Sequence, residues 1–427
     1  MSSKLGKICF LAALLVVPLA MFFLSTEKAP LKTADVKSPY RTRARMQADD
    51  QPPSVHAPIP DTKESLRPAK RVVSISTDRS YPGVTIIPQS GNEKIDLIDK
   101  NGALIHQWNF DAARARLLPN CNLLVVHGSK WGLMREPWSS LKHFVREYDW
   151  DGNLQWEFKA PGAVHHDVQR LPNGNTIFLY RSVLPEEQRA LLKDPARREL
   201  VNRSDGIMEV TPQKEVVWDW KLHEHFDPNA CGSEPCPFIT KRARDGKKEY
   251  DWTHSNSVTV IPPNRWFDAG DARFKPGNLM ILVRNWSTVY VIERPSGKPV
   301  WSYHGTYKGG LSGGHEAFMI TEGLPGAGNM LVFDNGRDKG TSFALEIAPD
   351  TKEVVWAYDV GDEFYSGAAG TLQRLPNGNT LISEDVPGRN FEVTPEGKKV
   401  WEVKNPYRTC RPHRYPYGYC PNLKEPS

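Results

Sequence analysis

One pattern of alternating apolar and polar residues recurs along the chain, and each copy ends in tryptophan. The copies read LIDKNGALIHQW, YDWDGNLQW, EVTPQKEVVW, VIERPSGKPVW, EIAPDTKEVVW and EVTPEGKKVW. Their closing residues are Trp108, Trp156, Trp218, Trp301, Trp356 and Trp401. In each copy two alternating arms flank a polar turn, which is of the DG, NG, SG or EG type in four of the six, and this arrangement predicts a β-hairpin.

A second recurring unit follows the tryptophans and predicts another hairpin. It reads RLLPNCNLLVV, QRLPNGNTIFL, PGNLMILV, PGAGNMLVF and QRLPNGNTLIS, with a turn at the Pro-Asn-Gly-Asn type sequence. Two hairpins per repeat make four strands, and a four-stranded sheet repeated around an axis is a β-propeller. The pattern therefore predicts an all-β, six-bladed β-propeller over residues 72–427. Since no second hairpin follows Trp401, we expect the segment from Val72 to Ile87 to complete the ring.

Two insertions interrupt the repeat. The stretch from Leu184 to Leu200 has the composition of a helix, and the stretch from His223 to Asp251 contains the sequence CGSEPC. Insertions in propellers project from the two faces of the ring. These two either wall a central pocket or are tolerated additions to the surface.

The N-terminal part of the chain has a different pattern. Lys4 and Lys7 precede an uncharged apolar run from Ile8 to Leu24, so residues 1–28 are predicted to be a signal anchor or signal peptide. The lack of a small-residue cleavage site favours an uncleaved anchor. Residues 29–71 are polar and Pro-rich, which predicts a disordered tether. We therefore expect an extracytoplasmic protein at the periplasmic face of the inner membrane, with a single N-terminal span, or a secreted protein if the segment is cleaved.

Charge and cysteine content refine this picture. The 55 basic and 50 acidic residues are interspersed, so no nucleic-acid surface is predicted. Export would place the six cysteines in an oxidising compartment. Short spacing predicts two local disulfides, one between Cys231 and Cys236 and one between Cys410 and Cys420. Cys121 lies in an apolar run and is expected to be a buried free thiol. No paired CxxC motif is present, so no zinc site is predicted.

Histidines are expected to converge on the propeller axis. In the segments VHHDVQRLPNGN, THSNSVTVIPPN and GHEAFMITEGLPGAGN, alignment on the proline places His166, Asn256 and His315 at equivalent points of inner strands. His254 should face the same side as Asn256, because strand side chains alternate. The same alternation predicts that His165 faces away.

Charged residues near these histidines suggest what the site could bind. Arg284 ends an apolar strand in MILVRNWSTVYVI, where a fixed guanidinium suits an oxyanion such as sulfate or phosphate. A structural salt bridge is the other interpretation of Arg284. Asp167 and Glu316 adjoin the histidines and are expected to face away from the channel. Few carboxylates would then remain for a metal site.

The segments HHD, DWTHSNS, ILVRN, GGHEAF and VFDNG, in this order on a propeller, resemble the arylsulfate sulfotransferases. The resemblance extends from about Pro82 to Trp401. It implies transfer of a sulfuryl group from an aryl sulfate ester to a phenolic acceptor, independent of PAPS or another nucleotide donor and without a cofactor. It also implies a sulfohistidine intermediate and a ping-pong order of substrates, and it makes a homodimer an expectation.

The resemblance assigns roles to the aligned residues. His315 would be the nucleophile, and His166 would assist proton transfer. His254, Asn256 and Arg284 would bind the sulfuryl oxygens. These roles agree with the chemistry of imidazole, which is a good nucleophile when neutral.

Three other functions remain open. A non-catalytic propeller of the cell envelope could bind protein or glycan, and replacement of the axial histidines and Arg284 would then have no consequence. A propeller hydrolase could cleave sulfate esters without transfer. A metal-dependent lyase or lactonase would use the histidines to hold a cation, which a metal assay would detect.

Overall fold

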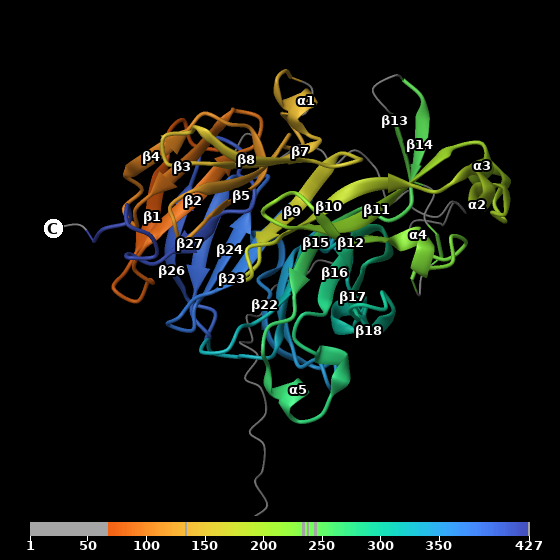
Figure 1. Cartoon of the computed structure of the whole chain (residues 1–427). Helices are drawn as coiled ribbons and strands as arrows, with labels where there is room; N and C mark the ends of the chain where they lie inside the picture. Colours follow the sequence, from red (N-terminus) through yellow and green to blue (C-terminus); the bar gives the residue numbers. More distant parts are fainter. Residues whose placement is uncertain (1–66, 133–134, 233–234, 237–238, 243–245, 426–427) are drawn as a thin grey trace, which may run out of the picture. The chain divides into compact units, whose positions relative to one another are not determined.

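Six sheets, antiparallel except for one strand pair in the third, repeat around one axis in the computed structural model (Figure 1). The structure describes residues 67–132, 135–232, 235–236, 239–242 and 246–425. The predicted six-bladed β-propeller is confirmed. The anchor predicted at residues 1–28 and all but the last five residues of the tether predicted at 29–71 lie outside the described residues. In the described part of the chain, no helix is long and apolar enough to cross a membrane.

Each blade is a sheet of at least four strands, ordered below from the inside of the ring outwards. Blade 1 contains β27 (His413–Tyr415), β2 (Val84–Gln89), β3 (Lys94–Ile98) and β4 (Leu104–Trp108). Blade 2 contains β5 (Ala112–Leu117), β6 (Leu123–His127), β7 (Phe144–Tyr148) and β8 (Leu154–Lys159). Blade 3 contains β9 (Val164–Arg170), β10 (Thr176–Val183), β11 (Val201–Val210) and β12 (Val216–Lys221), with β13 (Thr240–Arg242) and β14 (Lys248–Asp251) added beside β11.

The second half of the ring is more regular. Blade 4 contains β15 (Ser255–Val260), β16 (Leu279–Val283), β17 (Thr288–Ile292) and β18 (Pro299–Tyr303). Blade 5 contains β19 (Glu316–Met319), β20 (Met330–Asp334), β21 (Phe343–Ile347) and β22 (Val354–Tyr358). Blade 6 contains β23 (Thr371–Arg374), β24 (Thr380–Glu384), β25 (Arg389–Val393) and β26 (Lys399–Lys404), with β1 (Val72–Ser76) outside β26.

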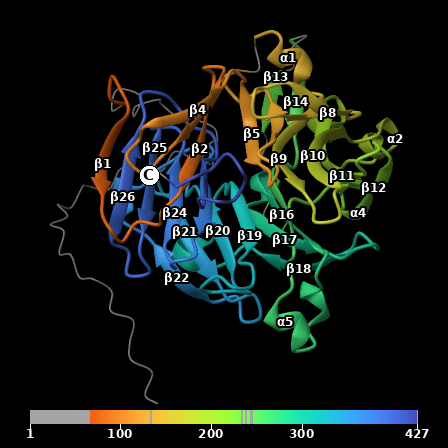
Figure 2. The ribbon, with the colours of Figure 1, turned by 60° about the vertical axis from the view of Figure 1, so that its left-hand side comes forward.

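Both ends of the propeller domain close the ring, which differs in part from the expectation. β1 pairs antiparallel with β26 at the outer edge of blade 6 (Figure 2). The innermost strand of blade 1 comes from the other end of the chain, where β27 pairs with β2. The N-terminal segment alone therefore does not complete the ring. β27 has only three residues and lies in a Pro-rich stretch, so it is too short for alternating apolar and polar residues to indicate a strand.

The repeated tryptophans join each blade to the next. Five indole N–H groups donate to a carbonyl oxygen in the outer turn of the following blade, at 2.7 to 2.9 Å; these are Trp108 to Trp150, Trp156 to Pro212, Trp301 to Pro349, Trp356 to Pro395 and Trp401 to Lys100. In blade 3 the neighbouring Trp220 takes this role and donates to Gly297 at 3.0 Å. Six such bonds form a closed cycle, so the sequence repeat marks the contacts between blades.

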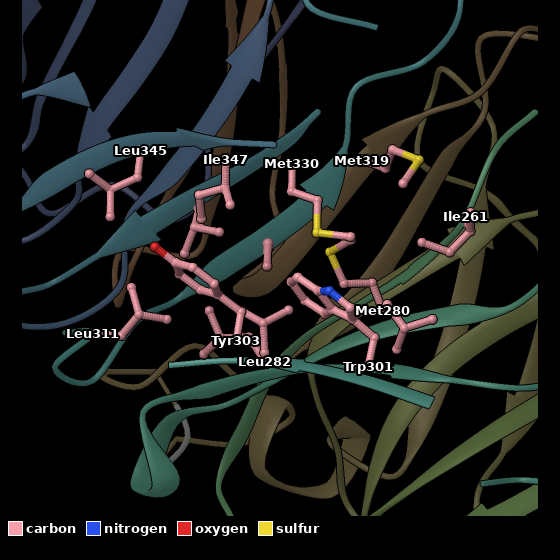
Figure 3. Packing of buried hydrophobic residues seen from close by; sticks show 14 of the residues in the cluster. Ile261, Met280, Leu282, Trp301, Tyr303, Leu311, Met319, Met330, Leu345 and Ile347 are labelled. Atoms are coloured by element: carbon pink, nitrogen blue, oxygen red, sulfur yellow. The ribbon is translucent and has the colours of Figure 1, made fainter. Parts of the chain in front are cut away.

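Apolar side chains fill the spaces between neighbouring blades. Between blades 4 and 5, Met280 and Trp301 pack with Met330 and Ile347 in one buried cluster (Figure 3). Burial of a large apolar side chain contributes about 1.5 to 3 kcal/mol. The blades are thus held together by packing as well as by the tryptophan bonds.

The insertions lie at defined ends of the axis. α1 (Trp138–Leu141) follows β6, and α2 (Glu186–Ala190) and α3 (Pro195–Arg198) follow β10. α4 (Leu222–His225) follows the outermost strand β12 and leads to the Cys231–Cys236 loop. Successive strands of a blade run in opposite directions, so the second and the fourth strand both end at the end of the axis where the inner strand begins. Each of these three insertions follows a second or a fourth strand, and all three therefore lie at that end. α5 (Arg265–Asp268) follows an inner strand, and it lies at the end opposite to α1 (Figure 1).

One predicted disulfide is confirmed and the other is wrong. Cys231 and Cys236 are bonded. Cys420 is bonded to Cys121 in the β5–β6 turn, and Cys410 is a buried free thiol whose Sγ lies 3.1 Å from the carbonyl oxygen of Ala113. Cys410 lies at Ala113, near the start of β5, whereas Cys420 is bonded to Cys121, beyond the end of β5, so the two cysteines are at opposite ends of this strand.

Candidate active site

The histidines predicted at the axis do lie at one end of the propeller. His166 is in the inner strand β9, His254 immediately precedes β15, and His315 immediately precedes β19. Arg284, in the 3₁₀ turn η3 (Arg284–Trp286), directly follows the second strand β16. Inner and second strands are antiparallel, so these positions from blades 3, 4 and 5 meet at the same end as the three insertions.

A break in strand geometry places His165 beside His166. His166 has a φ of 61°, and the pairing of β9 with β10 shifts register at this point. The two Nδ1 atoms lie 2.7 Å apart, so one ring donates to the other. The prediction that His165 faces away is therefore wrong, because alternation fails at a β-bulge. The ring of His166 also contacts that of His254, with centroids 5.1 Å apart.

Asp251 organises the second part of the site. Its Oδ2 accepts a hydrogen bond from Nδ1 of His254 at 2.6 Å, and it lies 3.5 Å from Nη2 of Arg284. Arg284 also donates through Nε to the side-chain oxygen of Asn285 at 2.9 Å. The side chain of His254 keeps 12% of its surface exposed, whereas Arg284 is buried. Asp251 thus orients both groups, and Nε2 is the atom of His254 turned away from the carboxylate.

The orientation of His315 is fixed by Asn335, which directly follows β20. The amide hydrogens of Asn335 are donated to the carbonyl oxygens of Ser366 at 2.6 Å and Ala369 at 2.8 Å. Its amide oxygen therefore faces His315 and accepts a hydrogen bond from Nδ1. A neutral imidazole with its proton on Nδ1 carries its lone pair on Nε2. His315 consequently has the protonation pattern of a nitrogen nucleophile.

Positive charge and burial keep His315 and His166 neutral. Burial lowers the pKa of His315 well below its usual range, and the nearby guanidinium groups of Arg337, Arg411 and Arg284 lower it further. Burial, His165 and His254 lower the pKa of His166 in the same way. Arg284 has its own pKa lowered by burial and by Arg337. A site with this excess of positive charge favours an anionic ligand.

Asn256 takes a supporting position. It is fully buried, and its Nδ2 donates to the carbonyl oxygen of Gly314 at 2.9 Å. This bond uses one of the two amide hydrogens of Asn256 and ties its side chain to the backbone that precedes His315. Direct contact of Asn256 with a sulfuryl oxygen stays a prediction.

Buried ion pairs lie at the centre of the ring, next to the histidines. Nη2 of Arg114 donates to Oε1 of Glu316 at 2.8 Å, and Nε of Arg114 lies 3.2 Å from Oδ1 of Asp167. Arg116 adds a second donor to Asp167 at 3.0 Å. Arg114 is in blade 2 and Glu316 in blade 5, which are opposite blades of the ring, so their bond crosses the axis. The expectation that Asp167 and Glu316 face away from the channel is wrong, because both neutralise arginines at its centre.

Sequence reasoning assigned no role to three residues that the structure brings into the site. Asp251 and Asn335 lie in the quoted DWTHSNS and VFDNG segments, so their motifs were found but their roles were not. Arg411 lies in the Pro-rich stretch before β27, where no pattern indicated it. Among the residues that the structure describes, no group of three or more His, Cys, Asp or Glu side chains is arranged to hold a metal ion.

Fold and site together define a β-propeller with a cluster of histidines and arginines at one end of its axis. Residues 144–406 match the model of the arylsulfotransferase (ASST) family. The match spans more than half of the chain, so this chain belongs to the arylsulfotransferase family. The family implies sulfotransferase activity with aryl sulfate and phenol substrates. A search of curated proteins found no match.

Solved structures show more distant likenesses. A protein of unknown function from Bacteroides caccae has a TM-score of 0.48 and 15% identity, over 78% of this chain and 99% of that chain. A streptogramin B lyase has a TM-score of 0.42 and 9% identity, over 81% of this chain and 98% of that chain. The dihydro-heme d1 dehydrogenase NirN has a TM-score of 0.39 and 11% identity, over 87% of this chain and 84% of that chain. At these scores the likenesses carry no argument about function.

Proposed function

We propose that this protein transfers a sulfuryl group from an aryl sulfate ester to a phenol in two steps, through a sulfohistidine at His315 and without a nucleotide donor. The observation that carries the proposal is the contact between His315 and Asn335, which leaves Nε2 as the lone-pair nitrogen in a positively charged site. Membership of the arylsulfotransferase family supports the choice of substrates.

In the first step, Nε2 of His315 attacks the sulfur of the bound ester. The N–S bond forms as the bond from sulfur to the aryl oxygen breaks, and the phenolate leaves with that electron pair. Arg284 and His254 bind the sulfuryl oxygens, whose charge must be stabilised as the bonds change. His254 donates its Nδ1 proton to Asp251, so in this contact it is an imidazolium that donates a second proton from Nε2. The hydrogen bond to Asn335 keeps the proton of His315 on Nδ1 throughout, so Nε2 remains the nucleophilic nitrogen.

In the second step, an acceptor phenol replaces the first product. Nε2 of His166 takes the phenolic proton, and the phenol oxygen attacks sulfur. The N–S bond breaks, and its electron pair returns to Nε2 of His315. The proton on His166 is given to the next departing phenolate, so atoms, charges and protons balance over a cycle. The neighbouring contact between His165 and His166 fixes the His166 ring for this exchange.

Steady-state kinetics with 4-nitrophenyl sulfate and phenol test the proposal. We expect release of nitrophenol that depends on phenol and parallel double-reciprocal lines as the phenol concentration is varied. Equal release without phenol would indicate a sulfate-ester hydrolase. No release from several aryl sulfates would favour a binding propeller, and loss of release on chelation would favour a metal-dependent enzyme.

We further propose that the reaction takes place outside the cytoplasm, with residues 1–28 as the anchor. The two disulfides support this location, because they persist in oxidising compartments. A fusion of alkaline phosphatase to the C-terminus should be active if the location is right, and inactive if the propeller stays in the cytoplasm.

A further inference from the structure

A buried arginine at the ring closure links the strands that carry the site. Arg411 is 2% exposed and precedes β27, in blade 1. Its Nη2 donates to the carbonyl oxygen of Asn256 at 2.6 Å and to that of His315 at 3.1 Å. These acceptors belong to blades 4 and 5, and blade 4 is opposite blade 1. The guanidinium of Arg411 therefore reaches across the axis to the backbone of two site residues.

The position of Arg411 is itself fixed. Its backbone N–H donates to both carboxylate oxygens of Asp385, at 3.2 and 3.1 Å, and its φ is 53°. Asp385 also accepts from the backbone N–H of Gly370 at 2.7 Å, which ties this turn to blade 6. A non-glycine residue with positive φ persists only where its surroundings hold it.

The charge of Arg411 has no close counter-ion among the described residues. No carboxylate of that part of the chain lies within 4.0 Å of its guanidinium, and its buried Nη1 has no hydrogen-bond partner there. Asp167 and Glu316 are nearby, but they are paired with Arg114. Arg411 is one of the charged groups that lower the pKa of His166 and of His315.

We propose that Arg411 is a positioning residue for the transfer reaction: it joins the strand of Asn256 to the strand of His315 and holds a fixed positive charge beside the histidines. This inference rests on the proposed function. Arg411 lies beyond residue 406, where the family match ends, so the match assigns it no role.

The charge has a consequence that a purely structural residue would not have. The charged groups that act on His315 are Arg337, Arg411 and Arg284, and Asn335 is its hydrogen-bond partner. Arg411 and His315 both lower the pKa of His166 as well. Removal of the charge should therefore raise the pKa of His315, so that the acid limb of kcat/KM moves to higher pH. Replacement by lysine keeps the charge and should leave that limb in place.

The test compares Arg411→Gln and Arg411→Lys with the control Arg414→Gln in the full-length protein. Arg414 lies in β27, is equally buried and pairs with Glu392, but it contacts no described residue of the site. We expect kcat for 4-nitrophenyl sulfate and phenol to fall about tenfold or more in both Arg411 variants. The acid limb should move only in Arg411→Gln. Arg414→Gln should lower the melting temperature without moving the limb.

Two outcomes would overturn the inference. One is wild-type kcat in either Arg411 variant; the other is an acid limb that does not move in a folded Arg411→Gln protein. If Arg411→Gln does not fold, kcat of Arg411→Lys decides alone. If the wild-type protein has no turnover, the proposed function fails separately, and NMR titration of His315 in the wild type and the Arg411 variants still tests the effect of the charge.

Discussion

The amide oxygen of Asn335 accepts the Nδ1 proton of His315, and this contact determines which nitrogen of the ring can attack sulfur. Two backbone carbonyls hold the amide in this orientation. The arrangement requires no general base next to His315, because the lone pair of Nε2 is already present at neutral pH.

Replacement of Asn335 by alanine should lower kcat by about 10²-fold, because the His315 ring loses its orientation and its fixed tautomer. Asn329 offers a control in the same blade, since it is buried in the turn before β20 and donates to Glu346 far from His315. Steady-state kinetics should show near wild-type kcat for Asn329→Ala. Equal losses of activity in both variants would mean that Asn335 acts only through stability.

Acid should destabilise the protein through its buried histidines. His127 is enclosed between the carbonyl oxygen of Asp111 and the hydroxyl of Tyr148, and burial lowers its pKa to about 4. The unfolded chain binds a proton at this residue near pH 6.5, whereas the folded chain binds it only near pH 4. Stability is therefore complete above about pH 6.5 and falls as the pH drops toward 4, by about 3 kcal/mol for His127 alone.

Urea unfolding of the wild type and of His127→Gln, at pH 7 and at pH 4.5, measures this contribution. The free energy of unfolding should fall less with acid in the variant. An identical fall in both proteins would show that His127 binds its proton equally well in the folded and the unfolded chain.

Loss of Arg114 should destabilise the centre of the ring. Arg114→Met leaves the carboxylates of Asp167 and Glu316 buried with less compensation, and the free energy of unfolding should fall by about 3 to 5 kcal/mol. The exposed pair of Arg79 and Glu396 is a control, because Arg79→Met should change stability by less than about 0.5 kcal/mol. Chemical denaturation measures both, and similar small changes would contradict a structural role for the central ion pairs.

The two disulfides should differ in their effect on stability. The Cys121–Cys420 bond spans 299 residues, whereas Cys231–Cys236 spans five. Loop-closure entropy predicts stabilisation of about 6 kcal/mol for the long loop and about 2 kcal/mol for the short one. Thermal unfolding of the paired Cys→Ser variants should show the larger loss for Cys121 and Cys420. The reverse order would mean that the C-terminal segment is held by β27 alone.

The repeat in the sequence was sufficient to predict the propeller, because five of its six tryptophans donate the same hydrogen bond to the next blade. In blade 3 the neighbouring Trp220 makes this bond in place of Trp218. The convergence of His166, His254 and His315 followed from the same alignment. Side-chain direction was predicted less well. Alternation failed at His165, where a bulge with positive φ at His166 turns both rings together.

Contacts between distant parts of the chain were beyond sequence reasoning. The pairing of Cys121 with Cys420 depends on β27, which is too short to have a periodic pattern. Arg411 reaches the site only because that same strand closes blade 1. Arg114 and Glu316 are 202 residues apart, and only ring closure makes them neighbours across the axis.

The most direct test of the account is the intact mass of the full-length protein after brief exposure to 4-nitrophenyl sulfate without an acceptor. We predict a gain of one SO₃ group that maps to His315, disappears on addition of phenol and is absent from His315→Ala. An adduct on another residue, or unchanged turnover in His315→Ala, would contradict transfer through this histidine.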